Sequence, residues 1–208
     1  MYEAFLARIN NFDGSNVFEI QTHEVEFFLN EGQSIVVDDF YKEYEKSEKA
    51  RRALSKLVLP RTLTGFTAEP IYTNGYKIST STVPNVLYMV AEEVSILHNG
   101  TTKRVPVKPM TMDSYSINLK NPFKKPYEEK VWRLDIGDTI NQVIIISPNP
   151  PQNYYLTYLQ IPTIIEISTT STSLLHEEFH IDIVDKAVMQ ALQAKQININ
   201  LTQNTKNG

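Results

Sequence analysis

The spacing of apolar residues changes twice along this chain, and these changes constrain the fold more than any other feature. Over the first sixty residues, apolar side chains recur every three or four positions, which is the period of an amphipathic helix. From residue 61 to about residue 170 the period falls to two, which is typical of strands. The helical period then returns. The pattern predicts an α+β fold in which helices at both ends of the chain enclose a β-rich middle.

The helical segments also carry signals at their ends. Residues 25–40 form one apolar stripe, and Ser47 is a suitable N-cap for a third helix that should stop before Pro60. A last helix is predicted over residues 171–195. We expect this helix to pack against the N-terminal helical part, residues 1–60, because both present an apolar stripe.

The β-rich part, residues 61–170, is expected to contain a hairpin. Two runs with strand character flank Asn99-Gly100, a pair that favours a two-residue hairpin turn. Pro106 makes the returning strand an edge or bulged strand, because proline cannot donate to a sheet ladder. The residues after it predict one or two helical turns. Three further strands are predicted over residues 130–135, 139–147 and 153–162.

The C-terminal residues 196–208 are predicted to form an extended arm. Ile197, Ile199 and Leu201 alternate with polar residues, and the segment has no neighbouring strand in the sequence. An extended segment of this kind can add to an exposed sheet edge of another protein. We therefore expect these three residues to contact another subunit. An arm folded back on the β-rich part is the alternative.

Composition narrows the class of protein. Apolar residues make up 41% of the chain and charged residues 21%, which is ordinary globular composition. The chain has no cysteine, which excludes disulfides, thiolate metal sites and a cysteine nucleophile, and which fits a reducing compartment. The first residues lack a signal-peptide pattern, and no apolar stretch approaches the ~20 residues that span a bilayer. We expect a soluble protein made inside a cell, without a membrane partner.

Positive charge is concentrated in one segment of an acidic chain. The formal net charge is −4, whereas residues 103–133 hold eight Lys/Arg against three Asp/Glu, which leaves −9 for the rest. Such a chain is a poor general binder of nucleic acid but suits docking to a complementary protein surface. We therefore expect Lys124, Lys125 and Arg133 to contact an acidic partner or a neighbouring subunit rather than DNA.

One short motif points to a different chemistry. His176, Glu177 and His180 match H-E-x-x-H, which on a helix can hold a catalytic zinc ion. Such an ion needs a third protein ligand, and the acids that follow lie too close to His180 to fold back onto it. The same letters fit an ordinary helix start, with Ser173 or Thr172 as N-cap and acids in the first turn. We therefore predict that no metal or cofactor binds here.

Other patterns with known chemistry are missing from the sequence. It contains no G-x-x-x-x-G-K-[ST], no G-x-S-x-G and no G-x-G-x-x-G. Aromatic residues in the β-rich part could stack nucleic-acid bases, but half-buried strand positions filled by aromatic side chains explain them better. These residues are Trp132, Tyr154, Tyr155 and Tyr158. The residues alone predict a structural or binding protein without catalytic groups.

Several segments taken together resemble a family of structural proteins from crAss-like bacteriophages. Two segments are similar to the N-terminal helices of that family: E-V-E-F-F-L-N-E-G-Q-S-I-V-V-D-D-F-Y and S-E-K-A-R-R-A-L-S-K-L-V. Five further segments follow in the same order as in the family: R-V-P-V-K-P-M-T-M-D-S-Y, N-P-F-K-K-P, V-W-R-L-D, Y-L-T-Y-L-Q-I-P-T-I-I and H-I-D-I-V-D-K-A-V-M-Q-A-L. Where the family has a basic residue before its prolines, this chain has Gln160 and Ile161.

The resemblance implies a ring protein of the virion neck or tail, similar to the adaptors that dock beneath the portal of short-tailed phages. It implies a cyclic homo-oligomer of twelve copies that binds the portal protein and neighbouring neck or tail ring proteins. The ring would line the channel for genomic DNA without reading its sequence, after assembly in the host bacterial cytoplasm. It also implies a protein that is not an enzyme and needs no cofactor.

Two other functions remain open at this stage. One is a zinc-dependent metallohydrolase that uses the H-E-E-F-H run, and the other is a nucleic-acid-binding accessory protein that uses the basic segment.

Overall fold

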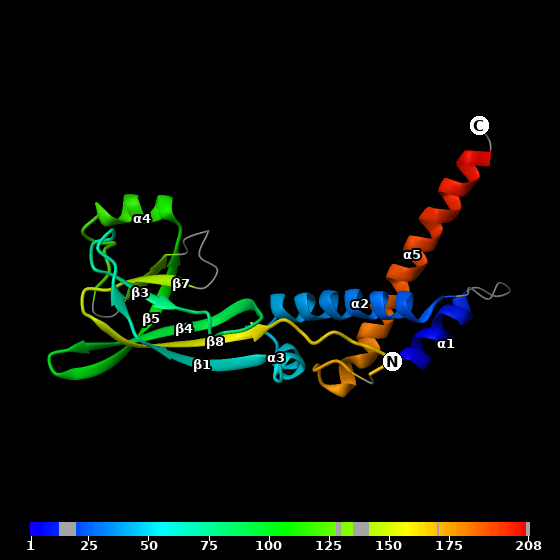
Figure 1. The fold of residues 1–208 in the computed structure, drawn as a ribbon, viewed down its shortest axis with the longest axis horizontal. Coiled ribbons are helices and arrows are strands. Elements are labelled where there is room, and N and C mark those ends of the chain that lie inside the picture. The colour runs from blue at the N-terminus through cyan, green and yellow to red at the C-terminus, as the bar shows by residue number, and fades with distance from the viewer. Residues whose placement is uncertain (13–19, 128–129, 135–141, 170, 207–208) are drawn as a thin grey trace. The chain divides into compact units, whose positions relative to one another are not determined.

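The computed structural model describes residues 1–12, 20–127, 130–134, 142–169 and 171–206, with the backbone alone for residues 12 and 195–206. The chain forms two compact units (Figure 1). The helical unit comprises Met1–Leu57 and Ile161–Gly208, and the strand unit comprises Val58–Gln160. The strand unit is therefore an insertion between two parts of the helical unit.

The helical unit contains the helices predicted at both ends of the chain. They are α1 (Tyr2–Phe12), α2 (Thr22–Lys42), α3 (Glu48–Leu54), a 3-10 turn η1 (Glu177–Phe179) and α5 (His180–Lys206). The Ser47 hydroxyl accepts a hydrogen bond from the backbone N–H of Ala50 at 3.3 Å, which confirms Ser47 as the N-cap of α3. Pro60 is not what ends α3, because the helix stops at Leu54 and Pro60 already lies within the first strand.

The core of the helical unit lies between α2 and α5. Val25, Leu29 and Val36 of α2 are buried, as are Ile183 and Ala187 of α5. The two helices approach closely at Gly32, where a Cβ atom would lie 2.6 Å from the carbonyl oxygen of Ile183. The predicted packing of N-terminal helices against the C-terminal helix is confirmed.

Polar residues of α2 hold the segment that returns from the strand unit. Glu26, Asn30 and Gln33 lie on one stripe of the helix, since they are spaced by four and three residues. The Gln33 side-chain amide donates to the carbonyl oxygen of Thr163 at 2.9 Å, and the N–H of Ile167 donates to Glu26 at 2.7 Å. The Asn30 side chain forms hydrogen bonds with the backbone of Ile165, which lies between Thr163 and Ile167. These contacts assign residues 161–167 to the helical unit rather than to the β-rich part.

The strand unit is one curled, mixed sheet with the order β1-β8-β4-β5-β6-β7-β3-β2. Neighbouring strands are antiparallel except β5 and β6, which are parallel and joined through the helix α4. The elements are β1 (Val58–Thr64), β2 (Thr67–Ala68), β3 (Gly75–Ser79), β4 (Val86–His98), β5 (Thr101–Met110), α4 (Met112–Leu119), β6 (Val131–Leu134), β7 (Gln142–Ile146) and β8 (Pro151–Gln160). Residue 135 of the strand predicted over residues 130–135, and residues 139–141 of the strand predicted over residues 139–147, lie outside the described residues.

The predicted hairpin is present as β4 and β5. Asn99 and Gly100 form its turn with φ angles of 47° and 77°, a left-handed conformation that Asn and Gly tolerate. The residues of β5 up to Pro106 pair with β4, and those from Val107 onward pair with β6. Pro106 therefore lies where the strand changes neighbours. The predicted edge or bulged strand is wrong, because β5 lies between β4 and β6 in the strand order and pairs with β4 without a register shift.

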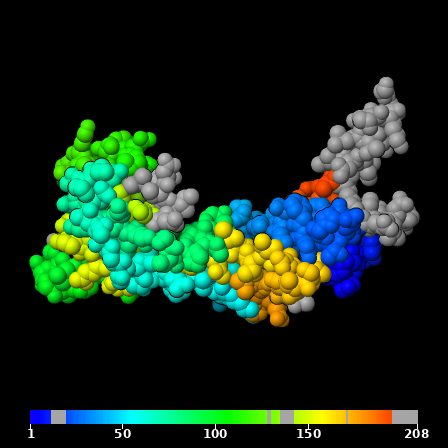
Figure 2. Space-filling model, viewed as in Figure 1, coloured from blue at the N-terminus to red at the C-terminus, as the bar shows by residue number. Residues whose placement is uncertain are grey.

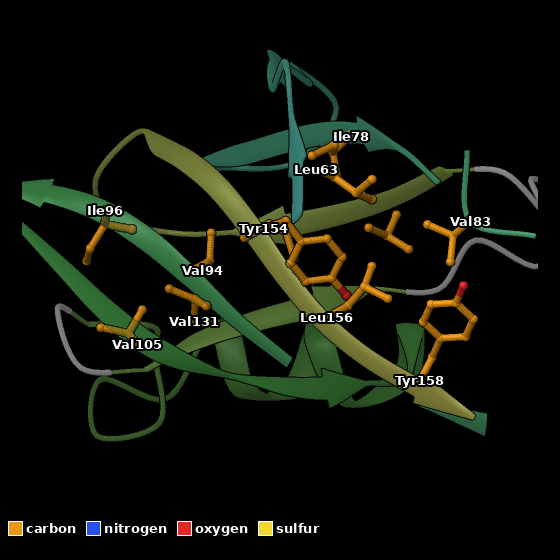
Figure 3. Close-up of a cluster of buried hydrophobic side chains, with 12 residues drawn as sticks. Leu63, Ile78, Val83, Val94, Ile96, Val105, Val131, Tyr154, Leu156 and Tyr158 are labelled. Carbon is orange, nitrogen blue, oxygen red and sulfur yellow. The ribbon is translucent and has the colours of Figure 1, made fainter. Parts of the chain in front are cut away.

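A cluster of buried side chains fills the inside of the curled sheet (Figure 3). Tyr154, Leu156 and Tyr158 of β8 lie in this cluster with Val94, Val105 and other aliphatic residues. Leu63 of β1 and Ile78 of β3 belong to it too, although their strands lie near opposite ends of the strand order. The sheet curls so that its two ends share one core.

The opposite face of β6 and β7 packs against α4. Trp132 and Ile144 are buried there together with Tyr115 of α4, whose ring meets that of Trp132 edge to face at 6.2 Å. Both faces of β6 and β7 are therefore covered, which explains why consecutive residues of these strands are buried.

The predicted extended arm is wrong. The backbone of α5 continues as a helix to Lys206 and includes residues 196–204. No proline or glycine occurs between Pro162 and Gly208, so nothing in the sequence interrupts the helix that begins at His180. Ile197 and Leu201 are also four residues apart, a spacing that fits a helix as well as their alternation fits a strand.

Candidate functional site

The H-E-x-x-H residues lie at the start of α5 rather than within it. His176 is the N-cap of η1, and His180 is the first residue of α5. A ring nitrogen of His180 lies 3.1 Å from the carbonyl oxygen of Leu175, and Nδ1 of His176 lies 3.8 Å from a carboxylate oxygen of Glu178. Ser173 is not the N-cap, since its hydroxyl accepts from the N–H of Leu175 instead. The helix starts later than predicted.

This arrangement does not place two imidazoles one turn apart on a helix face. Among the residues that the structure describes, no three His, Cys, Asp or Glu side chains gather in a way that could hold a metal ion. The carbonyl oxygen beside His180 accounts for the position of its ring without a metal. The absence of a bound metal stays a prediction for experiment.

Arg133 is not a surface residue, which corrects its expected role as a partner contact. Its guanidinium pairs with the carboxylate of Glu92, and the two side chains are 10% and 5% exposed. The hydroxyl of Tyr154 donates to the other Glu92 oxygen at 2.6 Å. Burial and the neighbouring carboxylate raise the pKa of Tyr154 far above its usual range. The group is a buried polar network within the curled sheet.

The aromatic residues of the strand unit do not form a base-stacking surface. Trp132, Tyr154 and Tyr158 are buried in the two cores. Tyr155 is half-buried, and the guanidinium of Arg104 covers its ring at 3.8 Å from the centroid. The explanation as strand positions filled by aromatic side chains is the one that the structure supports.

Lys124 and Lys125 are exposed, on the loop that follows α4. Their loop is locally ordered: the side chain of Asn121 accepts a hydrogen bond from the N–H of Phe123 at 3.0 Å, and its carbonyl accepts from Lys124 at 3.1 Å. Pro122 and Pro126 flank the three residues and restrict the backbone further. The two lysines are therefore presented to solvent from a stiff loop.

Sequence reasoning missed the exposed apolar side chains that lie near these lysines in the sequence. Phe123 is 94% exposed and Ile117 of α4 is 71% exposed, and Met112 and Tyr127 are also exposed. In Figure 2 the side chains of α4, drawn in green, lie on the surface of the strand unit. A phenylalanine between proline and two lysines, N-P-F-K-K-P, was a signal for such exposure, because it belongs to no apolar period. We call Phe123, Lys124 and Lys125 the FKK loop.

Charge is divided unequally between the two units. The helical unit carries ten Lys/Arg and sixteen Asp/Glu, a net charge of −6, and the strand unit carries ten and eight, a net charge of +2. The FKK loop lies on the positive unit. A surface with exposed aromatic and basic residues on one unit, and an excess of acids on the other, suits association between protein molecules.

Comparison with known proteins identifies the class of assembly. Residues 2–203 match the family described as phage tail ring protein 3/4. The chain belongs to this family. It is also similar to Ring protein 3 of Bacteroides phage crAss001, with 24% identity over 222 residues that cover 93% of this chain and 94% of the relative. The resemblance to crAss-like phage ring proteins is confirmed.

Family membership makes this ring protein a structural component of a phage virion. The match spans both the helical unit and the strand unit, including the FKK loop. Within the described residues, none of the helices has both the length and the apolar character that crossing a bilayer requires.

Proposed function

We propose that copies of this ring protein close into a cyclic homo-oligomer, with twelve subunits, in the head-to-tail connector of the virion. There it joins the portal protein to the tail and contacts the neighbouring neck or tail rings. The observation that carries the proposal is the match to the phage tail ring protein family over residues 2–203. The relative from phage crAss001, whose similarity covers 93% of this chain, is named Ring protein 3, and this name supports a ring as the form of the assembly.

The charge distribution supports a closed ring. In a cyclic oligomer each subunit presents one surface to the next subunit and a different surface to the previous one. Opposite charge on the two surfaces favours this head-to-tail contact over a symmetric pair, in which like surfaces would meet. The two units differ in net charge, −6 against +2, which supports a contact between the helical unit of one copy and the strand unit of the next.

The same charges support passage of genomic DNA through the ring without binding. The net charge of −4 on each subunit, with −6 on its helical unit, repels DNA phosphate and favours sliding over binding. Trp132, Tyr154 and Tyr158 are buried in the strand unit, and His176 lies before η1 whereas His180 begins α5. These features favour a channel-lining structural protein that is neither an enzyme nor a sequence-specific DNA-binding protein.

Two segments are proposed as contacts with other proteins of the assembly. Lys124 and Lys125 provide the basic contact. Ile197, Ile199 and Leu201 provide the second, and their backbone belongs to the helix α5 rather than to a strand. Removing residues 196–208 should leave both units folded, because all the buried side chains that the structure describes lie at or before Ala191. The shortened chain should then fail to bind the portal or an adjacent ring; normal binding would show that this segment has no role in docking.

The decisive experiment is electron microscopy of the purified full-length protein, combined with native mass spectrometry. The proposal expects closed rings of one subunit number, which mass spectrometry should report as twelve. Binding to double-stranded DNA should be weak and lost as salt rises. A protein that stays monomeric at all concentrations, both alone and with its portal, would contradict the ring. A high affinity for DNA at physiological salt would favour the nucleic-acid-binding alternative.

A metal measurement tests the hydrolase alternative directly. Elemental analysis of the purified protein should find no stoichiometric zinc. The His180→Ala variant should have the same metal content, because His180 contacts the Leu175 carbonyl oxygen. One zinc ion per chain that is lost in His180→Ala would overturn the structural role proposed for this residue.

A further inference from the structure

The FKK loop has the properties of an anchor for another molecule. Phe123 is the most exposed of the large apolar residues described, and its backbone is fixed by Asn121 and by the prolines on either side. An aromatic side chain held in this way loses little conformational entropy on binding. Aromatic residues that insert into pockets are also typical of the residues that dominate protein interfaces.

The helical unit contains an apolar groove that suits such a side chain. Val36 and Phe40 of α2 and Met189 of α5 form its apolar surface, and its volume is 250 Å³. Acidic residues and two lysines surround the apolar surface, and a second hollow adjoins it at Lys49 and Asp182. The groove therefore combines an apolar floor with a charged rim.

One acid on this rim is available for a new ion pair. Asp39 already pairs with Lys186 at 2.9 Å, and Asp185 pairs with Arg8 at 2.8 Å. Across the described part of the chain, Asp182 has no ion-pair partner, and it borders both hollows. A lysine next to an aromatic ring that is inserted into the groove could therefore form an ion pair with Asp182.

We propose that the FKK loop of one copy of this chain docks into the groove between α2, α3 and α5 of the next copy. Phe123 inserts against Val36, Phe40 and Met189, and Lys124 or Lys125 pairs with Asp182. The occupant is a second copy because the positive loop and the negative groove lie on the +2 and −6 units of one sequence. The inference rests on the proposed ring and names the surfaces that build it.

Disulfide trapping tests the contact directly, because the natural chain has no cysteine and hence no background. A Lys124→Cys variant is mixed with a Met189→Cys variant under mild oxidation. Each chain carries a single thiol, so a cross-linked heterodimer can only arise between two copies. The matched control replaces Met189→Cys by Ile71→Cys, an 80% exposed position in the strand unit. We expect the heterodimer with Met189→Cys and only traces with the control. Equal yields would overturn the proposal.

Substitution of the anchor gives the energetic test. Phe123→Ala should weaken self-association by roughly 10- to 30-fold, the effect of removing a central interface anchor. Folding should be unaffected, because Phe123 contacts solvent over nearly all of its surface. Ile71→Ala removes a similarly exposed apolar side chain from the same unit and should leave association unchanged. Identical association of the wild type and Phe123→Ala would overturn the role of the FKK loop.

Charge exchange tests the partner of the lysines. Lys124→Glu with Lys125→Glu should weaken assembly more at low salt than at high salt, and adding Asp182→Lys should restore most of it. As a control, Arg61→Glu with Lys103→Glu makes the same charge change at two exposed positions elsewhere on the strand unit. If Asp182→Lys restores nothing, Asp182 is not the counter-charge.

These outcomes separate the inference from the function it rests on. Full-length chains that form no ring would contradict the proposed function itself. Rings that form normally with Phe123→Ala, and without cross-linking from Lys124→Cys to Met189→Cys, would leave the ring in place and reject the docking of the FKK loop. Rings of Phe123→Ala that no longer bind another tail protein would assign the loop to that protein instead.

Discussion

Asn30 of α2 satisfies both backbone polar groups of Ile165. The N–H of Ile165 donates to the Asn30 side-chain oxygen at 2.8 Å, and the Asn30 amide donates to the Ile165 carbonyl oxygen at 3.0 Å. One side chain thus does for Ile165 what a neighbouring strand would do. Asn30→Ala removes both bonds and should lower the free energy of unfolding by about 1–3 kcal/mol, measured by urea denaturation.

Ser34 supplies the matched control on the same helix. It is exposed, and its hydroxyl donates to the Asn30 carbonyl oxygen at 3.1 Å. Ser34→Ala should change stability by no more than about 0.5 kcal/mol. Equal losses in the two variants would show that the Asn30 side chain does not hold the returning segment.

Gly32→Ala should destabilise the helical unit although alanine favours helices. The substitution gains about 1 kcal/mol of helix propensity. The added Cβ, however, would lie 2.6 Å from the Ile183 carbonyl oxygen and 2.9 Å from the Ala187 nitrogen, which are backbone atoms that cannot turn aside. Separating α2 from α5 should cost about 1–3 kcal/mol. We expect a net loss in thermal or urea unfolding; a gain would mean that the helices do not meet at Gly32.

The buried ion pair of Glu92 and Arg133 should contribute more to the free energy of unfolding than an exposed ion pair does. Arg133→Met leaves the Glu92 carboxylate buried without its counter-charge and should cost about 3–5 kcal/mol. Adding Glu92→Gln should recover part of that loss, because the unpaired charge is removed. Glu93→Gln, at an exposed neighbour that pairs with Arg104 at 3.8 Å, should cost less than about 1 kcal/mol. Additive losses at Glu92 and Arg133 would contradict a direct pair.

The contact between Asp39 and Lys186 predicts a small dependence of stability on pH. The hydrogen bond from Lys186 is the main cause that lowers the pKa of Asp39, against the opposing effect of burial. A carboxyl group whose pKa is lowered by folding stabilises the folded state at pH values above its ordinary pKa of about 4. This stabilisation is lost as the pH falls through the lowered pKa. Both side chains are more than one-third exposed, so the gain should stay below about 1 kcal/mol. Asp39→Asn should therefore be less stable at pH 7 and equal to the wild type at the acid end. A constant difference at every pH would exclude this pair.

The elements with strong periodic signals were predictable from the sequence. The apolar stripe of α2 and the buried residues Phe179 of η1 and Ile183 and Ala187 of α5 made the helical packing predictable, because three- and four-residue spacing leaves one buried face. Asn99-Gly100 located the hairpin, because few other residue pairs accept its backbone angles. In both cases a local pattern and the tertiary structure favour the same conformation.

The predictions that were wrong depended on information outside the local pattern. The Ile-Asn alternation after residue 196 favoured a strand, but the helix that precedes it continues because nothing stops it. Arg133 was read as a surface cation because its partner Glu92 lies 41 residues away in the sequence. The FKK loop was recognised only for its lysines, since exposure of Phe123 becomes visible once the sheet is folded.

The insertion of the strand unit has a consequence for how such ring proteins diversify. Its first and last strands are antiparallel neighbours with Val58 opposite Leu159, so the two ends of the insertion lie about 5 Å apart. A module whose ends meet in this way can be exchanged as a cassette, because the helical unit needs only two adjacent chain ends to remain closed. Recombination between phages can thus replace the whole strand unit, with its FKK loop, while α2 and α5 keep their core.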